Sequence, residues 1–300
     1  MTRSPAIKEV GHLVTAHRQR EGGGFIVRRP LPTEGLELRD PFLLIDEMGP
    51  ADYGPGEAVG APDHPHRGFE TVTYMLEGAF EHEDSAGHRG ALRAGDVQWM
   101  TAGAGIVHSE EPSREIKEKG GRVHGFQIWV NLPARLKMST PRYQEVPGDR
   151  IPRARTDDGK AEVRLIAGEA LGTKAVIDTN TPIVYQDWTL AAGADVTVPL
   201  QSGEDALVYV FEGSVRVGDE GKVVGDGQLA VLGAGDAVRL RGPEGEGKHG
   251  RLLLLAGTPI REPVARYGPF VMNTRQEIVQ AVEDYQSGKM GEITRTARAG

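Results

Sequence analysis

The chain has 300 residues and is 38% hydrophobic, which is enough for two ordinary domains that each bury a core. It has no cysteine, which excludes disulfides, a thiolate nucleophile and thiolate metal ligands, so any metal must bind to imidazole and carboxylate. The formal net charge of -8 argues against direct binding to nucleic acid, which needs lysine and arginine to replace phosphate counterions.

The distribution of small and apolar residues favours short strands. The chain has 41 glycines and 19 prolines but few aromatic residues, a composition typical of many tight turns in an all-β protein. The beginning, Met1 to Pro5 and the mixed polar residues after it, lacks the apolar core of a signal peptide. The longest apolar run, Leu252 to Ala256, is far shorter than the ~20 residues that cross a membrane. We therefore expect a cytoplasmic protein without a membrane partner, and a monomer.

The segment DHPHRGFE, residues 63–70, is the first with a chemical signal. In an extended chain alternate side chains share a face, so His64, His66 and Glu70 are predicted to point into one barrel interior. Two imidazoles two residues apart on a strand form a natural metal clamp. Arg67, between them and Glu70, is predicted to be a surface ion-pair partner rather than an anion-binding residue of the site.

From Thr71 the stretch TVTYMLEGAFEHEDSAGHRGALRAGDVQWM alternates apolar and polar residues and is broken at glycines. This pattern predicts antiparallel strands joined by glycine turns. Trp99, near its end, is expected in the core, as are Phe126 and Trp129 further on. His82 and His88 are expected to lie outside the site, like the remaining histidines of the chain, His12, His17, His124 and His249.

The next chemical signal is His108-Ser109-Glu110, which follows Gly103 and Gly105. It supplies another imidazole and another carboxylate at alternate positions. Neutral imidazoles with a carboxylate suit iron, manganese, nickel, copper or zinc, and leave coordination positions open for water, substrate or dioxygen. Four or five ligands are thus available, with Glu70 and Glu110 as the alternative carboxylates.

A second stretch from Ala206, ALVYVFEGSVRVGDEGKVVGDGQLAVLGAGDAVRL, repeats the alternation of the first. Glu212-Gly213 matches Glu77-Gly78, and Gly235-Asp236 matches Gly95-Asp96, which indicates an internal duplication. Each half is predicted to curl into a barrel or double-sheet jelly roll, because closure removes exposed strand edges. The second half has no histidine between Pro199 and Lys248, so one metal per chain is expected.

The proline-containing segment 133–152 is the predicted connection, with a boundary near Arg142. The predicted domains are 1–142, which binds the metal, and 143–290, which does not. Near the end, Thr274 and Glu277 form a capping box before an apolar pattern of helical spacing, which predicts a closing helix at about 275–287. Its apolar stripe needs a surface to cover, and residues 291–300 are predicted to be a flexible tail.

At this point the sequence resembles the pirin family, a branch of the bicupins. The resemblance rests on DHPHRGFETVTY, GDVQWMTAGAGIVHSE, HGFQIWVNLP and REPVARYGPFVMNT, which together extend over nearly the whole chain. It implies two tandem cupin (double-stranded β-helix, or jelly-roll) barrels and one iron held in the first of them. By motif position the ligands are His64, His66, His108 and Glu110, and Glu70 becomes a neighbouring or structural carboxylate. Manganese, nickel, copper, cobalt or zinc are the other ions considered.

The resemblance implies two functions of different kinds. One is a quercetin 2,3-dioxygenase, in which a flavonol binds the metal and reacts with dioxygen, with Glu110 accepting a proton as a ligand or as a base beside the metal. The other is an iron redox sensor that acts as a transcriptional co-regulator or binds a metabolic enzyme. Other cupin chemistry on a small metabolite is a third reading, since one ligand set supports many reactions.

Overall fold

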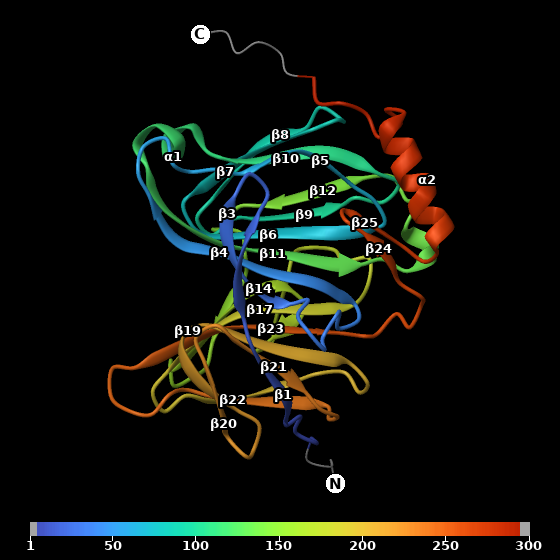
Figure 1. Cartoon of the computed structure of the whole chain (residues 1–300). Helices are drawn as coiled ribbons and strands as arrows, with labels where there is room; N and C mark the ends of the chain where they lie inside the picture. The colour runs from blue at the N-terminus through green and yellow to red at the C-terminus, as the bar shows by residue number, and fades with distance from the viewer. Residues whose placement is uncertain (1–4, 295–300) are drawn as a thin grey trace. The chain divides into compact units, whose positions relative to one another are not determined.

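The computed structural model describes residues 5–294 and shows two compact units made almost entirely of antiparallel strands (Figure 1). One unit, here called the N-terminal barrel, contains residues 18–29, 42–148 and, of the described residues, 260–294. The other, the C-terminal barrel, contains residues 30–41, 149–259 and, of the described residues, 5–17. Two tandem cupin barrels are thus confirmed, but the units interleave in sequence and do not follow the consecutive split at residue 142.

The N-terminal barrel is built from two sheets. The larger has the order β12-β9-β6-β11-β4-β3-β2 and the smaller β5-β10-β7-β8. Its strands are β2 (His17–Glu21), β3 (Phe25–Leu31), β4 (Phe42–Tyr53), β5 (Ala61–His66), β6 (Phe69–Glu77), β7 (Ala79–Asp84), β8 (Arg89–Arg93), β9 (Val97–Thr101), β10 (Ile106–Pro112), β11 (Gly121–Asn131) and β12 (Arg142–Val146). A short helix, α1 (Arg114–Lys119), and a 3-10 turn, η1 (Ala134–Leu136), lie in its connections.

The C-terminal barrel repeats this plan. Its main path is β1-β21-β19-β23-β17-β14-β13. Off this path, β20 and β22 pair with β19, and β18 pairs with β22. The strands are β1 (Val10–Thr15), β13 (Arg153–Arg155), β14 (Ala161–Ala167), β17 (Ile183–Ala191), β18 (Asp195–Pro199), β19 (Asp205–Val217), β20 (Lys222–Gly225), β21 (Gln228–Leu232), β22 (Ala237–Arg241) and β23 (His249–Gly257), with a small hairpin of β15 (Glu169–Ala170) and β16 (Thr173–Lys174). The strand β1, although first in the chain, belongs here because it pairs with β21.

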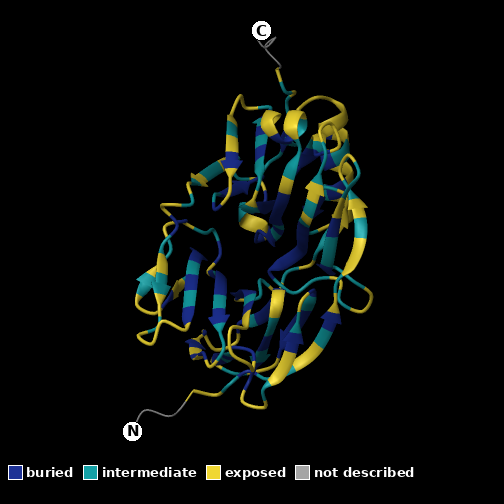
Figure 2. Cartoon of the chain, turned by 90° about the vertical axis from the view of Figure 1, so that its left-hand side faces the viewer, coloured by how far each residue is buried: buried dark blue, intermediate teal, exposed yellow. Residues whose placement is uncertain are grey.

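The interior of the C-terminal barrel is filled with apolar side chains. On the paired strands β18 and β22 the inward residues form the pairs Val198–Val238 and Val196–Leu240, all buried in one hydrophobic cluster. Figure 2 shows the alternation of buried and exposed residues along such strands. This packing leaves no metal-ligating side chain at the positions where the paired strands of the other barrel carry histidines.

The duplication is confirmed, but one of its predicted correspondences is wrong. In the N-terminal barrel the amide of Gly95 donates to the carbonyl of Met75, at 2.8 Å, and in the C-terminal barrel Gly227 donates to Val210 at 2.8 Å. Gly227 is therefore the counterpart of Gly95. Gly235 lies one turn later, between β21 and β22, and the sequence match misled because both connections contain a glycine with a positive φ.

A hairpin and a helix close the N-terminal barrel: β24 (Ala265–Tyr267), β25 (Phe270–Met272) and α2 (Arg275–Gln286). The predicted capping box of Thr274 and Glu277 is confirmed, and Ile278 and Ala281 of the helix pack in one apolar cluster with Val107 of β10. The helix groups with the first barrel because of these contacts. Neither helix of the described residues is long and apolar enough to cross a membrane.

The predicted flexible tail is only partly covered by the described residues, which end at Thr294. The described part is held: Arg89 donates to the carbonyl of Thr294 at 2.8 Å, and Ile293 packs against the cluster under the helix. Residues 295–300 lie outside the described part of the chain.

Candidate metal centre

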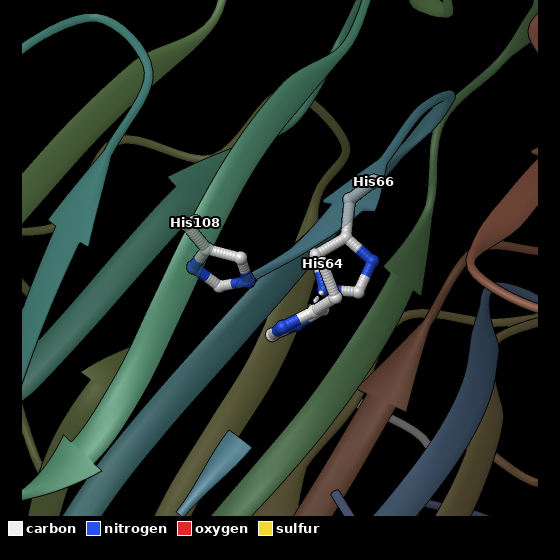
Figure 3. A group of neighbouring side chains, drawn as sticks. All are labelled: His64, His66 and His108. Atoms are coloured by element: carbon white, nitrogen blue, oxygen red, sulfur yellow. Dashed lines mark hydrogen bonds between the residues drawn. The ribbon is translucent and has the colours of Figure 1, made fainter. Parts of the chain in front are cut away.

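Three histidines meet inside the N-terminal barrel (Figure 3). His64 and His66 lie on β5 and His108 on β10, two antiparallel strands on which His108 is directly opposite His64 and Ile106 is opposite His66. This register puts all three side chains on one face. The ring centroids are 4.4 to 4.9 Å apart, and one nitrogen from each ring lies within 4.8 Å of the others.

The hydrogen bonds of the rings fit a metal site. Nδ1 of His64 bonds to the carbonyl of Pro62 at 2.7 Å, so Nε2 is the ring nitrogen that could bind a metal. This Nε2 lies 3.0 Å from Nε2 of His66. Both ring nitrogens of the buried His108 have no hydrogen-bond partner among the described residues. Buried polar atoms normally have a hydrogen-bond partner, so the unpartnered ring nitrogens of His108, beside two other imidazoles, fit the role of a metal ligand.

The protonation state of the cluster also suits a cation. Burial, and after it the charge of His64, lowers the pKa of His66 and of His108 well below the ordinary value for histidine. Both rings are therefore neutral at pH 7, which is the form that binds metals. The three-histidine cluster together with the similar structures described below indicates a metal ion.

Glu110 lies on β10 two residues after His108 and lines the same pocket as His64 and His66. It is not a member of the tight three-histidine group. One of its oxygens lies 2.9 Å from Oγ1 of Thr73, and the other accepts from Nε2 of Gln127 at 3.0 Å. Glu110 as the fourth ligand stays a prediction, supported by its place in the pocket.

Glu70 does not share the face of His64 and His66, so this expectation is wrong. The chain between them is broken at Arg67 and Gly68, where Gly68 has a φ of 88°, and the count of alternate residues restarts in β6. Glu70 is buried outside the pocket lining and accepts a hydrogen bond from Oγ1 of Thr101 at 2.6 Å.

The cluster opens into a cavity of about 490 Å³. Trp129, expected in the core, lines this cavity, and its ring lies 5.3 Å from that of His66. Trp99 and Phe126 are buried core residues, as expected. A sequence signal for the role of Trp129 is Gln127, a polar residue among apolar neighbours on β11. Residues two positions apart on a strand share a face, so a polar Gln127 indicates that Trp129 also faces the cavity.

Another wall of the cavity carries a buried ion pair that the sequence did not suggest. Asp46 of β4 is 5% exposed and accepts two hydrogen bonds from Arg29, from Nε at 2.6 Å and from Nη2 at 2.5 Å. Burial raises the pKa of Asp46 to about 6, and the hydrogen bonds of Arg29 oppose this rise. Arg29 also lies 2.8 Å from Glu21. The only sequence signal was a pair of charged residues, Asp46 and Glu47, directly after the apolar run of residues 42–45.

Arg67 is neither at the surface nor in the cavity. It is 5% exposed, and its guanidinium donates to Asp284 of α2 at 2.8 Å and to the carbonyl of Ala104 at 2.6 Å. The other histidines lie outside the cavity, as expected. His12, His17, His88 and His249 are exposed, while His82 and His124 are buried beside Glu145 and Glu47 respectively.

Two antiparallel double-sheet barrels in one chain, with a histidine cluster in one of them, define a bicupin. The Pirin family model matches residues 24–130, and the model of the Pirin C-terminal cupin domain matches residues 185–291. The chain belongs to the pirin family.

Similar proteins cover nearly the full length of the chain. A pirin-like protein of Solanum lycopersicum is 46% identical over 93% of this chain and 91% of its own, and the Pirin of Mus musculus is 45% identical over 95% and 94%. Among solved structures, a quercetin 2,3-dioxygenase from Acinetobacter baumannii has a TM-score of 0.87 and 37% identity, over 96% of this chain and 100% of its own.

Proposed function

We propose that this protein is a metal-dependent dioxygenase of the quercetin 2,3-dioxygenase type, which cleaves a flavonol with dioxygen and releases carbon monoxide. The observation that carries the proposal is the three-histidine cluster at the wall of a cavity of about 490 Å³, a volume in the range of small-molecule sites. The likeness to the Acinetobacter baumannii quercetin 2,3-dioxygenase supports the choice of substrate.

The proposed ligands are His64, His66, His108 and Glu110, with iron as the preferred ion because of the family resemblance. The donor set would also accept manganese, nickel, copper, cobalt or zinc. When bound, the ion supplies Lewis acidity that lowers the pKa of a substrate hydroxyl, and a position at which both reactants can be oriented.

The chain's own residues would bind the substrate and take its proton. The apolar side chains of the cavity exclude water from an aromatic ligand; they are Phe25, Leu44, Met48, Phe80 and Trp129. Glu110, the cavity carboxylate on the same strand as His108, would hold the proton released by the substrate hydroxyl. Thr73 and Gln127 fix its orientation through the hydrogen bonds described above.

The test is to measure bound metal by elemental analysis and to follow quercetin absorbance with and without oxygen. We expect one ion per chain, loss of absorbance only with oxygen, and release of carbon monoxide. His64→Ala should lose both the ion and the turnover, whereas His12→Ala, at an exposed histidine of β1, should keep both. Turnover that survives in His64→Ala protein without metal would refute the metal-centred mechanism.

A redox-sensing regulatory protein is the second candidate. Arg67 follows His66 directly and donates a hydrogen bond to Asp284 of α2. This helix exposes Val279 and Tyr285, so a change at His66 could be transmitted to a surface helix. Capture of a protein partner that depends on ferrous against ferric iron, in protein that does not consume quercetin, would favour this role.

A further inference from the structure

A polar strip crosses the wall of the cavity. Asp46 on β4 lies directly opposite Gln127 on β11, and Gln127 lies opposite Thr73 on β6. Residues directly opposite one another in paired strands share a face of the sheet, and all three side chains line the cavity. The strip is thus a continuous row of hydrogen-bonding groups inside a mostly apolar pocket.

The row next to it is apolar on β4 and β11 and lies beside the proposed metal ligands. Trp129 is opposite Leu44, and the ring of Trp129 packs at 5.3 Å against His66. Moving two residues along β11 from Trp129 to Gln127 covers about 7 Å. An aromatic ligand that reaches the histidines across Trp129 would therefore meet the polar strip with its far end.

Asp46 has acceptor capacity left for such a ligand. A carboxylate offers about four acceptor positions, and the fork of Arg29 uses one on each oxygen. Arg29 is itself held by Glu21, so the carboxylate is fixed before a ligand arrives. A hydroxyl donating to a fixed, desolvated carboxylate makes a strong hydrogen bond.

We propose that Asp46, fixed by Arg29, is a specificity-determining residue that accepts a hydrogen bond from a ring hydroxyl of the ligand remote from the metal. The site would then select polyhydroxylated aromatic compounds over analogues that carry only the metal-binding hydroxyl and carbonyl. This inference rests on the proposed function, because it takes the cavity as the flavonol site. Burial raises the pKa of Asp46 only to about 6, so the carboxylate is ionised and able to accept at pH 7.

The experiment measures binding, so that it does not depend on turnover. Metal-loaded protein is titrated without oxygen at pH 7.5 with quercetin and with 3-hydroxyflavone, which lacks the remote hydroxyls, and binding is followed by calorimetry. The wild type should bind quercetin at least about tenfold more tightly, the size expected for one hydrogen bond to a charged group. Asp46→Asn should remove most of this preference and leave the affinity for 3-hydroxyflavone within about twofold.

The matched control is Asp52→Asn, on the same strand β4 but with a 76% exposed side chain that pairs with Arg122; it should keep the wild-type preference. Equal weakening of both ligands in Asp46→Asn would make Asp46 a purely structural residue and overturn the proposal. So would equal affinity of the wild type for the two ligands, a result that needs no variant to fold. Selective binding without turnover would support the role of Asp46 and refute the dioxygenase.

Discussion

His108 is the residue whose surroundings say most about the site. It is buried, its two ring nitrogens have no hydrogen-bond partner in the described part of the chain, and its pKa is lowered by burial. The unfolded chain would take up a proton near pH 6.5, whereas the folded, metal-free protein resists it. The folded state is therefore expected to lose stability as the pH falls below 6.5.

This gives a pH prediction for the metal-free protein. Between pH 7.5 and pH 5.5, the free energy of unfolding of the wild type should fall relative to that of His108→Gln, which has no group to titrate at this position. Urea unfolding of both proteins at the two pH values measures the difference. A wild type that gains stability over the variant on acidification would contradict the described surroundings of His108.

Asp46 should change the stability of the folded protein with pH in the opposite direction to His108. Its pKa is raised, so the protonated form is favoured in the folded state, and the stability it contributes is present below pH 3.8 and lost as the pH rises through about 6. The rise from 3.8 to about 6 corresponds to about 3 kcal/mol. Between pH 4 and pH 7 the free energy of unfolding of the wild type should fall by up to that amount relative to that of Asp46→Asn, as measured by denaturant titration. If the difference between the two proteins does not change with pH, the hydrogen bonds of Arg29 compensate fully for the burial of Asp46.

At the scale of elements, the strand pair β5 and β10 forms the cluster and the closing helix α2 supports it. Arg67 leaves β5 directly after His66 and is bonded on both its backbone and its side chain: its amide donates to the carbonyl of Pro269, at 3.3 Å, and its guanidinium reaches Asp284. The hairpin and helix therefore hold the end of β5.

Asp284→Asn should loosen this support. It removes the charge that faces Arg67 and Lys289, so the amides of α2 and of β25 should exchange with solvent faster than in the wild type, as measured by hydrogen-deuterium exchange. Glu283→Gln, at an exposed position on the same helix, is the control and should leave exchange unchanged. Unchanged protection in Asp284→Asn would show that apolar packing alone holds the helix.

The sequence predicted elements where a local pattern decides them. Alternation and glycine turns predicted the strands, and Thr274 with Glu277 predicted the start of α2. Within one strand, alternation also placed His64 and His66 together. It failed for Glu70, because Arg67 and Gly68 interrupt the strand and the alternation was extended across this glycine. Asp46 was missed because its part in the cavity depends on which strands pair, which is set by the whole barrel.

At the scale of the whole chain, the duplication produced two barrels of the same plan with different interiors. One holds imidazoles and a polar strip, and the other a continuous apolar cluster. The sequence predicted this difference from the missing histidines, but not that the chain's first strand completes the C-terminal barrel. Pairing between residues more than 200 positions apart leaves no local trace.

The role of β1 can be tested directly. Val14 of β1 is 8% exposed and pairs with Leu229 of β21, so Val14→Asp would bury an unpaired charge at this edge. We expect the amides of β21 to lose protection in hydrogen exchange, whereas the exposed His12→Ala on the same strand should leave them protected. Unchanged protection of β21 would mean that β1 adds little to the C-terminal barrel.

We propose that His64, His66 and His108 bind one ion. X-ray absorption of protein loaded with ferrous iron without oxygen can detect these ligands, because imidazole gives a characteristic scattering from the outer atoms of the ring. We predict a single iron per chain with about three imidazole ligands, at the ~2 Å distances typical of such bonds. A spectrum without imidazole scattering, or one unchanged by His108→Ala, would show that these three histidines do not hold the ion together.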